Sequence, residues 1–256
     1  MDDIVQHSVN DLAHALEPRA VQSWPARETR LLNGWLLRFS DGYSSRCNSV
    51  STLEFDGQLD SAIEAVEAAY HARGLAPQFQ ISPASQPHGL EAALVRRGYR
   101  HKPPTVLMIA EAAAIAAPIG EVQILAAPDA DFARLTLEGS HSPEDGAERL
   151  ATLARITLPK AHVVTRSSSE IVSCGASVAT GDWASVYVMR TSANHRRMGH
   201  GSRVLQGIAN WARGQDATKL YLQVDESNAP GQALYARTGF RDGYRYLHYY
   251  APEAPK

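Results

Sequence analysis

The sequence predicts an α/β fold with a mixed sheet, and two features of its second half support the prediction. Apolar runs of strand length alternate there with amphipathic helical segments, an order typical of an α/β unit. A basic, glycine-bearing turn joins one of these strands to the helix that follows it. With 256 residues, 44% of them hydrophobic, the chain can bury a sizeable core in one large domain or two small ones.

The first half is expected to contain both helices and strands. Spaced apolar residues indicate a helix over 3–17 that is closed by Pro18, and Asp41-Gly42 is a turn pair suited to a hairpin over 34–50. The remaining elements follow from apolar periodicity and strand-like runs. They are a helix over 56–74, a strand over 77–82, a short helix over 89–98 and a strand over 105–110.

The alanine- and proline-containing stretch 111–120 has the composition of a linker, and a new pattern starts after it. The sequence therefore predicts one domain over 1–110 and a second over 121–256. In the second domain the strands are expected over 121–125, 161–167, 170–179, 183–191, 219–225 and 243–250, and the helices over 129–139, 143–157, 199–214 and 230–239.

A weak internal similarity relates the two halves. The segment 79–100 resembles the segment 222–241, either through a structural duplication or through chance recurrence of a strand–helix–glycine–strand pattern. Leu94 stands opposite Tyr235 in this alignment, and the first half has no basic, glycine-bearing turn. We therefore expect a single active site, located in the second domain.

Composition excludes several classes of protein. Lys and Arg number 25 and Asp and Glu 27, a balance that argues against a general nucleic-acid binder. The start of the chain lacks the features of a signal peptide, and the most apolar run, 112–120, is too short to span a bilayer. The only two cysteines, Cys47 and Cys174, favour a reducing compartment and are expected to be buried. We expect a cytoplasmic protein without nucleic-acid or membrane partners.

The strongest functional signal lies in the segment 189–205, MRTSANHRRMGHGSRVL. A strand is expected to end here and a helix to begin, so that backbone N–H groups and the helix dipole favour an anion. The glycines allow close approach, the arginines add charge and a serine adds a hydroxyl donor. These features predict a phosphate or pyrophosphate site, and the spacing fits neither a Walker nor a Rossmann loop. The residues concerned are Arg196, Arg197, Gly199, Gly201 and Ser202.

The pattern Arg196-x-x-Gly199-x-Gly201 resembles the acyl-CoA loop of the GCN5-related N-acetyltransferases (GNATs), most of all their FR47-like branch. The segment 220–240 is similar to that family's next strand, an asparagine, and a helix with a tyrosine before Gly-Phe. The resemblance is specific over 183–250 and loose over 121–182. It implies a GNAT fold, in tandem with an incomplete, degenerate GNAT-like half over 1–110, and acetyl-CoA as co-substrate.

The resemblance also implies roles for individual residues. Backbone groups of Met189 and Thr191 would pair with the pantetheine arm, which Asn228 would also contact. Tyr235 would protonate the leaving thiolate, although a tyrosine here could instead only pack on the sheet. Thr191 stands where an aliphatic residue is usual, and His200 where a small or aliphatic one is usual. The pyrophosphate would be held by the run from Arg196 to Ser202, namely Arg196, Arg197, Gly199, His200, Gly201 and Ser202.

The general base is left open by the sequence. Asp225 and Glu226 follow a strand and could deprotonate an ammonium group directly or through water. A solvated loop pair ahead of the next helix is the alternative interpretation, and an ordered water relay would serve equally. The weaker candidates are Asp182, Glu138 and His141.

Three polar residues of the expected hairpin are candidate substrate ligands, because arginine can bind a carboxylate through two hydrogen bonds. They are Arg38, Arg46 and Asn48, and surface positions on an edge hairpin are the alternative. No metal site is expected, since His195 and His200 lack a third ligand at a suitable spacing.

The expected activity is transfer of an acetyl group from acetyl-CoA to a primary amine by direct attack in a ternary complex. The acceptor is expected to be a small molecule such as an amino acid, and the protein a monomer or homodimer. The alternatives are an acetyltransferase for proteins or peptides, which needs an open groove, and a non-catalytic acyl-CoA-binding module.

Overall fold

The chain forms two compact units in a computed structural model that describes residues 8–118 and 122–252. The first unit comprises Met1–Val106 and Tyr244–Lys256, and the second comprises Leu107–Gly243. The final strand therefore groups with the first unit, whereas the sequence places it in a domain over 121–256. The expected linker over 111–120 holds a short helix, α4 (Ala112–Ile115), which belongs to the second unit.

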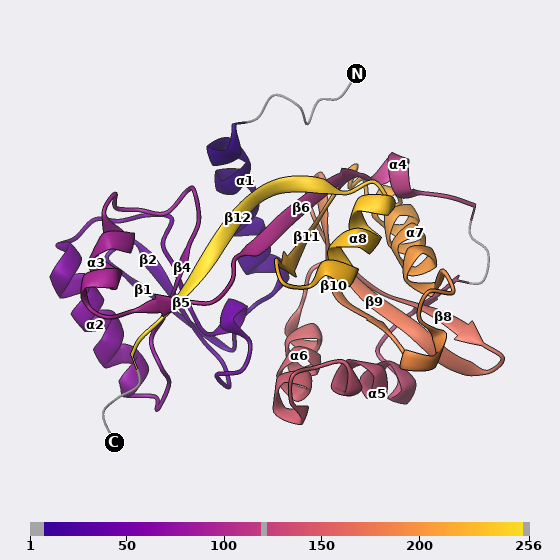
Figure 1. Cartoon of the computed structure of the whole chain (residues 1–256), viewed down its shortest axis with the longest axis horizontal. Coiled ribbons are helices and arrows are strands. Elements are labelled where there is room, and N and C mark those ends of the chain that lie inside the picture. The colour runs from indigo at the N-terminus through magenta and orange to yellow at the C-terminus, as the bar shows by residue number, and fades with distance from the viewer. Residues whose placement is uncertain (1–7, 119–121, 253–256) are drawn as a thin grey trace. The chain divides into compact units, whose positions relative to one another are not determined.

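In the first unit, a mixed sheet has the strand order β1-β2-β3-β4-β12, with β5 paired to β12 (Figure 1). β3 runs parallel to β4, and the pairs β1–β2, β2–β3, β4–β12 and β5–β12 are antiparallel. The helices are α1 (Val9–Ser23), η2 (Ser45–Cys47), α2 (Leu59–His71) and α3 (Leu90–Arg96). The strands are β1 (Glu28–Leu32), β2 (Trp35–Phe39), β3 (Val50–Ser51), β4 (Gln78–Ile81), β5 (Arg100–His101) and β12 (Arg241–Tyr250).

Two local predictions for the first unit were wrong. The hairpin joins β1 to β2 through Asn33-Gly34, whose φ angles of 49° and 82° are those that a two-residue hairpin turn requires. Asp41-Gly42 lies in the loop after β2. α1 also continues through Pro18 to Ser23, because its buried face extends beyond the proline to Ala20 and Ser23, and this burial offsets one lost hydrogen bond.

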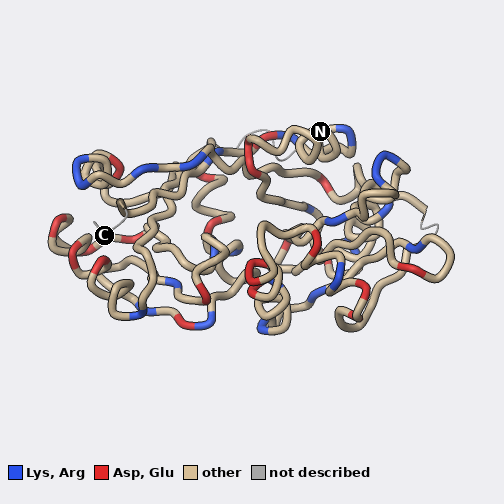
Figure 2. The backbone as a smooth tube through the Cα atoms, turned by 60° about the horizontal axis from the view of Figure 1, so that its bottom comes forward, with Lys and Arg blue, Asp and Glu red and all other residues tan. Residues whose placement is uncertain are grey.

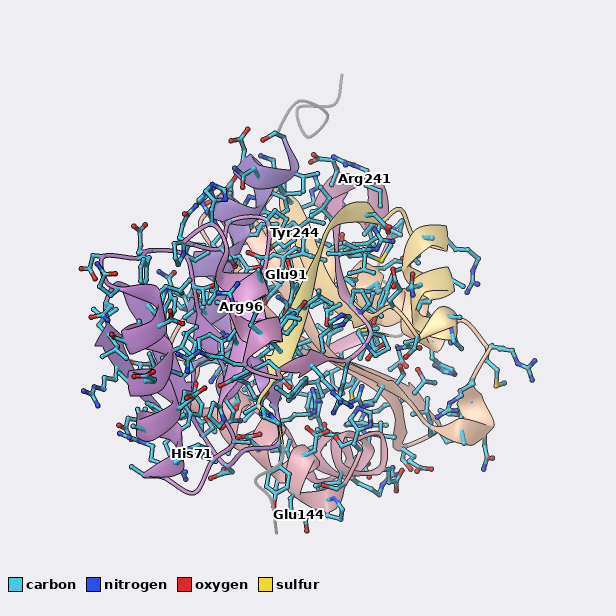
Figure 3. The ribbon with its side chains drawn as sticks, turned by 60° about the vertical axis from the view of Figure 1, so that its left-hand side comes forward. His71, Glu91, Arg96, Glu144, Arg241 and Tyr244 are labelled. Carbon is cyan, nitrogen blue, oxygen red and sulfur yellow. The ribbon has the colours of Figure 1, made fainter. Side chains whose placement is uncertain are left out.

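The apolar core of the first unit lies between its sheet and the helices α2 and α3. Trp35, Leu37 and Phe39 alternate along β2 and point into this core, as does Phe79 of β4. Tyr249 of β12 joins it from the end of the chain, and its hydroxyl donates to Glu91, labelled on α3 in Figure 3, at 2.6 Å. The C-terminal strand thus supplies part of this core.

In the second unit, the sheet has the strand order β6-β11-β10-β9-β8-β7. β10 and β11 are parallel, and the pairs from β7 to β10 are antiparallel. The strands are β6 (Thr105–Glu111), β7 (Val122–Leu125), β8 (Lys160–Ser167), β9 (Glu170–Thr180), β10 (Trp183–Thr191) and β11 (Lys219–Asp225). Besides α4, the helices are α5 (Ala130–Glu138), α6 (Pro143–Arg155), η3 (Ala193–His195), α7 (His200–Arg213) and α8 (Ala229–Arg237).

Helices cover both faces of the second sheet. A Cβ on Gly207 of α7 would lie 2.8 Å from Val163 of β8, so α7 packs closely on that face. Phe132 of α5 stands edge-on to His162, with ring centroids 5.6 Å apart. Successive residues of a strand point to opposite faces, so α5 covers the face opposite α7. Asp129 caps α5 and Ser142 caps α6, whose first turn carries Glu144, labelled in Figure 3.

The mixed α/β architecture predicted from the sequence is confirmed. Lys and Arg positions are interspersed with Asp and Glu positions in both units (Figure 2), as the net charge of −2 suggests. Within the described part of the chain, every helix is too short or too polar to cross a membrane.

Candidate active site

The strands β10 and β11 diverge at the carboxyl end of their pairing. Their parallel ladder runs from Trp183↔Lys219 to Val186↔Leu222, whereas β10 continues to Thr191 and β11 to Asp225. On its other side β10 bulges against β9, where the register shifts between Tyr187 and Arg190. The backbone of Met189 and Thr191 therefore lies beyond the β10–β11 ladder, at an edge where an extended ligand can pair.

The helix start predicted to bind an anion lies directly after β10. Gly199 caps α7 with φ 84° and ψ −4°, and Arg197 also has a positive φ of 63°. Gly199 offers no side chain to cap the helix, so the first-turn N–H groups are suited to an external acceptor. Arg196 and Arg197 are exposed beside it, and Ser202 is half-buried. The structure thus provides the geometry that phosphate binding needs.

Gly201 brings three elements of the site together. A Cβ at this position would lie 3.1 Å from Leu234 of α8 and 3.9 Å from the Thr191 hydroxyl of β10. The second glycine of the motif is thus explained by close packing of α7 on α8. Thr191 stands where the family pattern has an aliphatic residue. Its hydroxyl lies 2.8 Å from the Ser173 hydroxyl of β9, a contact that explains the threonine.

The side chain of His200 points into the protein. It is 7% exposed, and its Nδ1 lies 3.0 Å from both the Thr165 hydroxyl and Nη2 of Arg203. Arginine can only donate, so Nδ1 accepts from Arg203, and the inward-pointing ring leaves the backbone of His200 as its part of the loop. Arg203, which the sequence analysis missed, has Nη1 3.2 Å from a Cβ built on Gly199 and so lies at the helix start. Its position three residues after His200 in the same motif could have indicated it.

Tyr235 is held at the end of α8. The helix begins at the cap Asn228, whose Oδ1 accepts from the Gly231 N–H at 3.1 Å. It ends where the Tyr235 carbonyl accepts from the Phe240 N–H at 3.0 Å, and the two rings pack edge-on at 5.9 Å. The pattern of tyrosine before Gly-Phe therefore fixes the position of this half-buried tyrosine.

Of the two candidate bases, Asp225 is the exposed last residue of β11, and Glu226 is the first residue of the exposed loop that leads to α8. Oδ1 of Asp225 accepts from the Ser227 N–H at 2.8 Å and from its hydroxyl at 2.6 Å, which orders the loop. Glu226 is also exposed, and its carbonyl accepts from Gln232 at 2.7 Å. The weaker candidates have other contacts: Asp182 pairs with Lys219, Glu138 with Arg134, and the backbone N–H of His141 bonds Asp145.

The substrate ligands expected in the hairpin region belong to the first unit, and two of them have structural roles. Arg38 is 3% exposed and donates to Ser49 and Gln80 at 2.7–2.8 Å. Asn48 is 1% exposed, and its amide bonds the backbone of residues 40, 42 and 44. These contacts remove both residues from the candidate ligands. Arg46 lies 5.5 Å from the Trp24 ring and stays a prediction.

A second pair of arginines, missed in the sequence, lies on the other face of β10. A Cβ built on Gly139 would collide with the side chain of Arg190, which therefore packs over the end of α5. Nε of Arg149 on α6 lies 3.0 Å from both carboxylate oxygens of Asp145. Burial and then the Arg149 charge lower the pKa of Arg190, against the opposing influence of Cys174, Tyr235 and Asp145. Only the strand–helix packing reveals this cluster.

The described residues contain no group of three His, Cys, Asp or Glu side chains arranged to hold a metal ion. His195 instead contacts the Ser192 hydroxyl at 2.9 Å. Cys47 and Cys174 are buried, as predicted, and are not bridged to each other; burial raises the pKa of Cys174 to about 12.

Comparison with known proteins agrees with this geometry. The family model described as "Probable histone acetyltransferase Rv0428c C-terminal" matches residues 13–249. "Uncharacterized N-acetyltransferase YobR" of Bacillus subtilis (strain 168) is 27% identical over 232 residues, covering 88% of this chain and 93% of YobR. A solved GCN5-related N-acetyltransferase from Kribbella flavida has a TM-score of 0.71 at 17% identity, covering 98% of each chain. A tandem GNAT protein from the clavulanic acid biosynthesis pathway has a TM-score of 0.61 at 14% identity, covering 94% of this chain and 88% of that one.

The diverging strands and the loop before α7 define a fold of the GNAT class, which confirms the fold expected from the sequence. The chain belongs to the family whose model it matches over 13–249, within the GCN5-related N-acetyltransferases, and is an acyltransferase enzyme with acetyltransferase activity of the GNAT type.

Proposed function

We propose that the protein transfers the acetyl group of acetyl-CoA to a primary amine of a small molecule, by direct attack in a ternary complex. The observation that carries the proposal is the divergence of β10 from β11 beyond Val186↔Leu222, next to the helix start at Gly199. Together these features offer an extended backbone edge and an anion site on one strand–turn–helix segment.

The residues of this segment fit acetyl-CoA. Met189 and Thr191 would pair with the pantetheine arm, and the first turn of α7 would bind the pyrophosphate. The carbonyl of Met189 accepts from Arg190 at 3.0 Å and that of Thr191 from Arg196 at 3.4 Å. A carbonyl oxygen has two lone pairs, so each can accept a second bond. Arg196, Arg197 and Arg203 would neutralise the phosphate charge, and the amide of Asn228 would contact the arm.

Acetyl-CoA, when bound, supplies an activated thioester. The side chains of this protein would then manage two protons while the amine nitrogen bonds the acetyl carbon and the carbon–sulfur bond breaks. The Tyr235 hydroxyl would donate its proton to the leaving sulfur, since phenol and thiol have similar basicity. The proton of the attacking amine would pass to Asp225 or Glu226, directly or through water.

The test is amine-dependent release of free thiol from acetyl-CoA, measured over a panel of small amines. Tyr235→Phe is expected to lower kcat by about 100-fold, the usual effect of losing a general acid, while the Kd of acetyl-CoA changes little. Tyr43→Phe is the matched control, because Tyr43 is 52% exposed and lies in the first unit.

The results separate the parts of the proposal. No amine-dependent thiol release from any amine, with acetyl-CoA binding shown by calorimetry, would contradict small-molecule acetylation. An unchanged kcat in Tyr235→Phe would contradict only the role of Tyr235.

Acetylation of a protein or peptide is the second candidate, and the description of the matching family favours it. The two candidates are distinguished by incubating the enzyme with acetyl-CoA and a mixture of peptides and small amines. Mass spectrometry of both fractions then shows which class gains acetyl groups. Acetylated peptides without acetylated small amines would favour the second candidate.

A further inference from the structure

Arg190 lies at the same end of β10 as the proposed donor site, but on the opposite face of the sheet. Its neighbours Met189 and Thr191 face α7: a Cβ built on Gly175 would lie 2.6 Å from Met189 and 2.8 Å from Val204 of α7. Because side chains alternate along a strand, Arg190 points to the other face, where it packs over Gly139. A group bound by Arg190 would therefore approach the acetyl site from the side opposite the phosphate loop.

The guanidinium of Arg190 has unused hydrogen-bonding capacity in a partly buried place. Nη1 donates to the Met189 carbonyl at 3.0 Å, but the buried Nε has no hydrogen-bond partner among the described residues. A buried donor without a partner is unfavourable, so such groups are rare unless a ligand or water satisfies them. Arginine is also the residue best suited to binding a planar anion through parallel bonds.

Arg149 adds a second positive charge to this cluster. Its ion pair with Asp145 runs through Nε rather than through the two terminal amino groups. The side chains of Arg149 and Asp145 are only 15% and 5% exposed. Asp145 is fixed in turn by the His141 N–H at 3.2 Å, at the start of α6. The ion pair of Asp145 is with Arg149, so the two arginines and this one carboxylate leave a net charge of +1 for a bound anion.

We propose that Arg190 and Arg149 bind a carboxylate of the acceptor, so that the substrate is an amine carrying a carboxylate, as an amino acid does. This inference rests on the proposed function and gives its acceptor a chemical class. A single uncompensated charge matches a monoanion. Thr191, the residue after Arg190, and Leu234, the residue before Tyr235, both lie within 4 Å of a Cβ built on Gly201, so this end of β10 is close to the helix of the proposed acid. Two nearby cations also favour the neutral form of the acceptor amine, the form that attacks.

The test compares amino acids with their carboxamides, which keep the amine and lose the charge. The wild-type enzyme is expected to acetylate at least one amino acid with a kcat/KM roughly 10- to 100-fold above that of its amide, the range for a charged hydrogen bond. Arg190→Gln and Arg149→Gln are expected to abolish this preference by raising KM for the amino acid, with little change for the amide. Arg190→Lys, which keeps the charge, should restore part of it.

Arg134→Gln is the matched control, because Arg134 forms ion pairs on α5 with side chains that are 38–57% exposed. A thermal melt of each variant shows whether it folds. Equal kcat/KM for amino acids and amides in the wild type would overturn the inference while leaving the proposed function intact. An equal loss for both substrates in Arg190→Gln would also overturn it, since that is the effect of a purely structural role.

If no amine is acetylated, binding measurements still test the carboxylate site separately from the proposed acetyl transfer. Calorimetry with CoA present then measures the affinity of an amino acid and of its amide. Tighter binding of the amino acid that is lost in Arg190→Gln would support the subsite, even though acetylation had failed. Equal binding of the pair, or a preference that Arg190→Gln leaves intact, would overturn it.

Discussion

Glu17 is a buried carboxyl group at the centre of a polar network in the first unit. It is 2% exposed and accepts hydrogen bonds from Tyr244, labelled in Figure 3, at 2.8 Å and from Gln80 at 2.5 Å. Burial raises the pKa of Glu17 to about 7, against the lowering effect of Tyr244, Arg38 and Gln80. The folded protein therefore holds a proton here that the unfolded chain releases near pH 4.5.

Replacing this carboxyl should change how stability depends on pH. The contribution of Glu17 to the free energy of unfolding is fully present below the unfolded pKa of 4.5. It is lost as the pH rises through the folded pKa of about 7, a difference of roughly 3 kcal/mol. Glu17→Gln cannot ionise and avoids this loss. The free energy of unfolding of the variant, relative to that of the wild type, should therefore rise by about 3 kcal/mol between pH 5 and pH 8. Urea unfolding at both pH values measures the change.

His248 affects the pH dependence of stability in the opposite direction, because burial lowers its pKa to about 3 and folding then favours its neutral form. That contribution is present in both proteins and cancels in their difference. The exposed Glu54→Gln of the same unit is the control. A constant difference between Glu17→Gln and the wild type across this pH range would contradict the assignment.

Arg38 illustrates what a sequence cannot show about a single residue. It alternates with Leu37 and Phe39 on β2, so the pattern places it on the face that an amphipathic strand gives to solvent. In the fold, Gln80 and Ser49 take its hydrogen bonds on that face. The two arginines of the proposed carboxylate site, Arg190 and Arg149, come from distant segments, so no spacing in the sequence relates them.

At the scale of elements, local rules predicted most helices and strands, and the exceptions required tertiary information. The motif that starts α7 is local, and its geometry follows from glycine and helix termini. The bulge of β10, where Val188 adopts a φ of 51°, has no local signal, because a β-branched residue is disfavoured there. It is visible only in the register of β10 against β9.

The cap of α7 provides a test at this scale. Gly199→Ala places a methyl group at φ 84°, 3.2 Å from Arg203 Nη1 and at the edge of the proposed phosphate site. We expect a loss of about 1 kcal/mol in stability from the backbone strain and a roughly tenfold rise in the Kd of acetyl-CoA. Thermal melts and calorimetry measure the two effects.

Gly74→Ala separates these effects, because Gly74 has a φ of 67° with no atom within 4 Å of the added methyl group. It should show the same loss of stability with unchanged acetyl-CoA binding. If both variants bind acetyl-CoA like the wild type, the helix start at Gly199 does not hold the pyrophosphate.

At the scale of the molecule, the sequence correctly indicated two compact parts, but it placed the boundary between them differently from the structure. A linker composition at 111–120 suggested a boundary, and chain order then assigned everything after it to the second domain. The structure instead returns residues 244–256 to the first unit. Strand order within a sheet depends on pairing between distant segments, such as Leu247↔Ile81, and the composition of neither segment reveals it.

Tyr249 tests which body the last strand stabilises. The residue is 2% exposed, sits in the apolar core with Phe79, and donates to Glu91. Tyr249→Ala should cost roughly 3–5 kcal/mol through the lost ring, and Tyr249→Phe, the control, only about 1 kcal/mol through the lost hydroxyl. Hydrogen exchange should then show the larger loss of protection in β2 and β4, and a smaller one in β8 and β9. The domain boundary predicted at 111–120 gives the opposite expectation. If the last strand belonged to the second domain, β8 and β9 would lose more protection than β2 and β4.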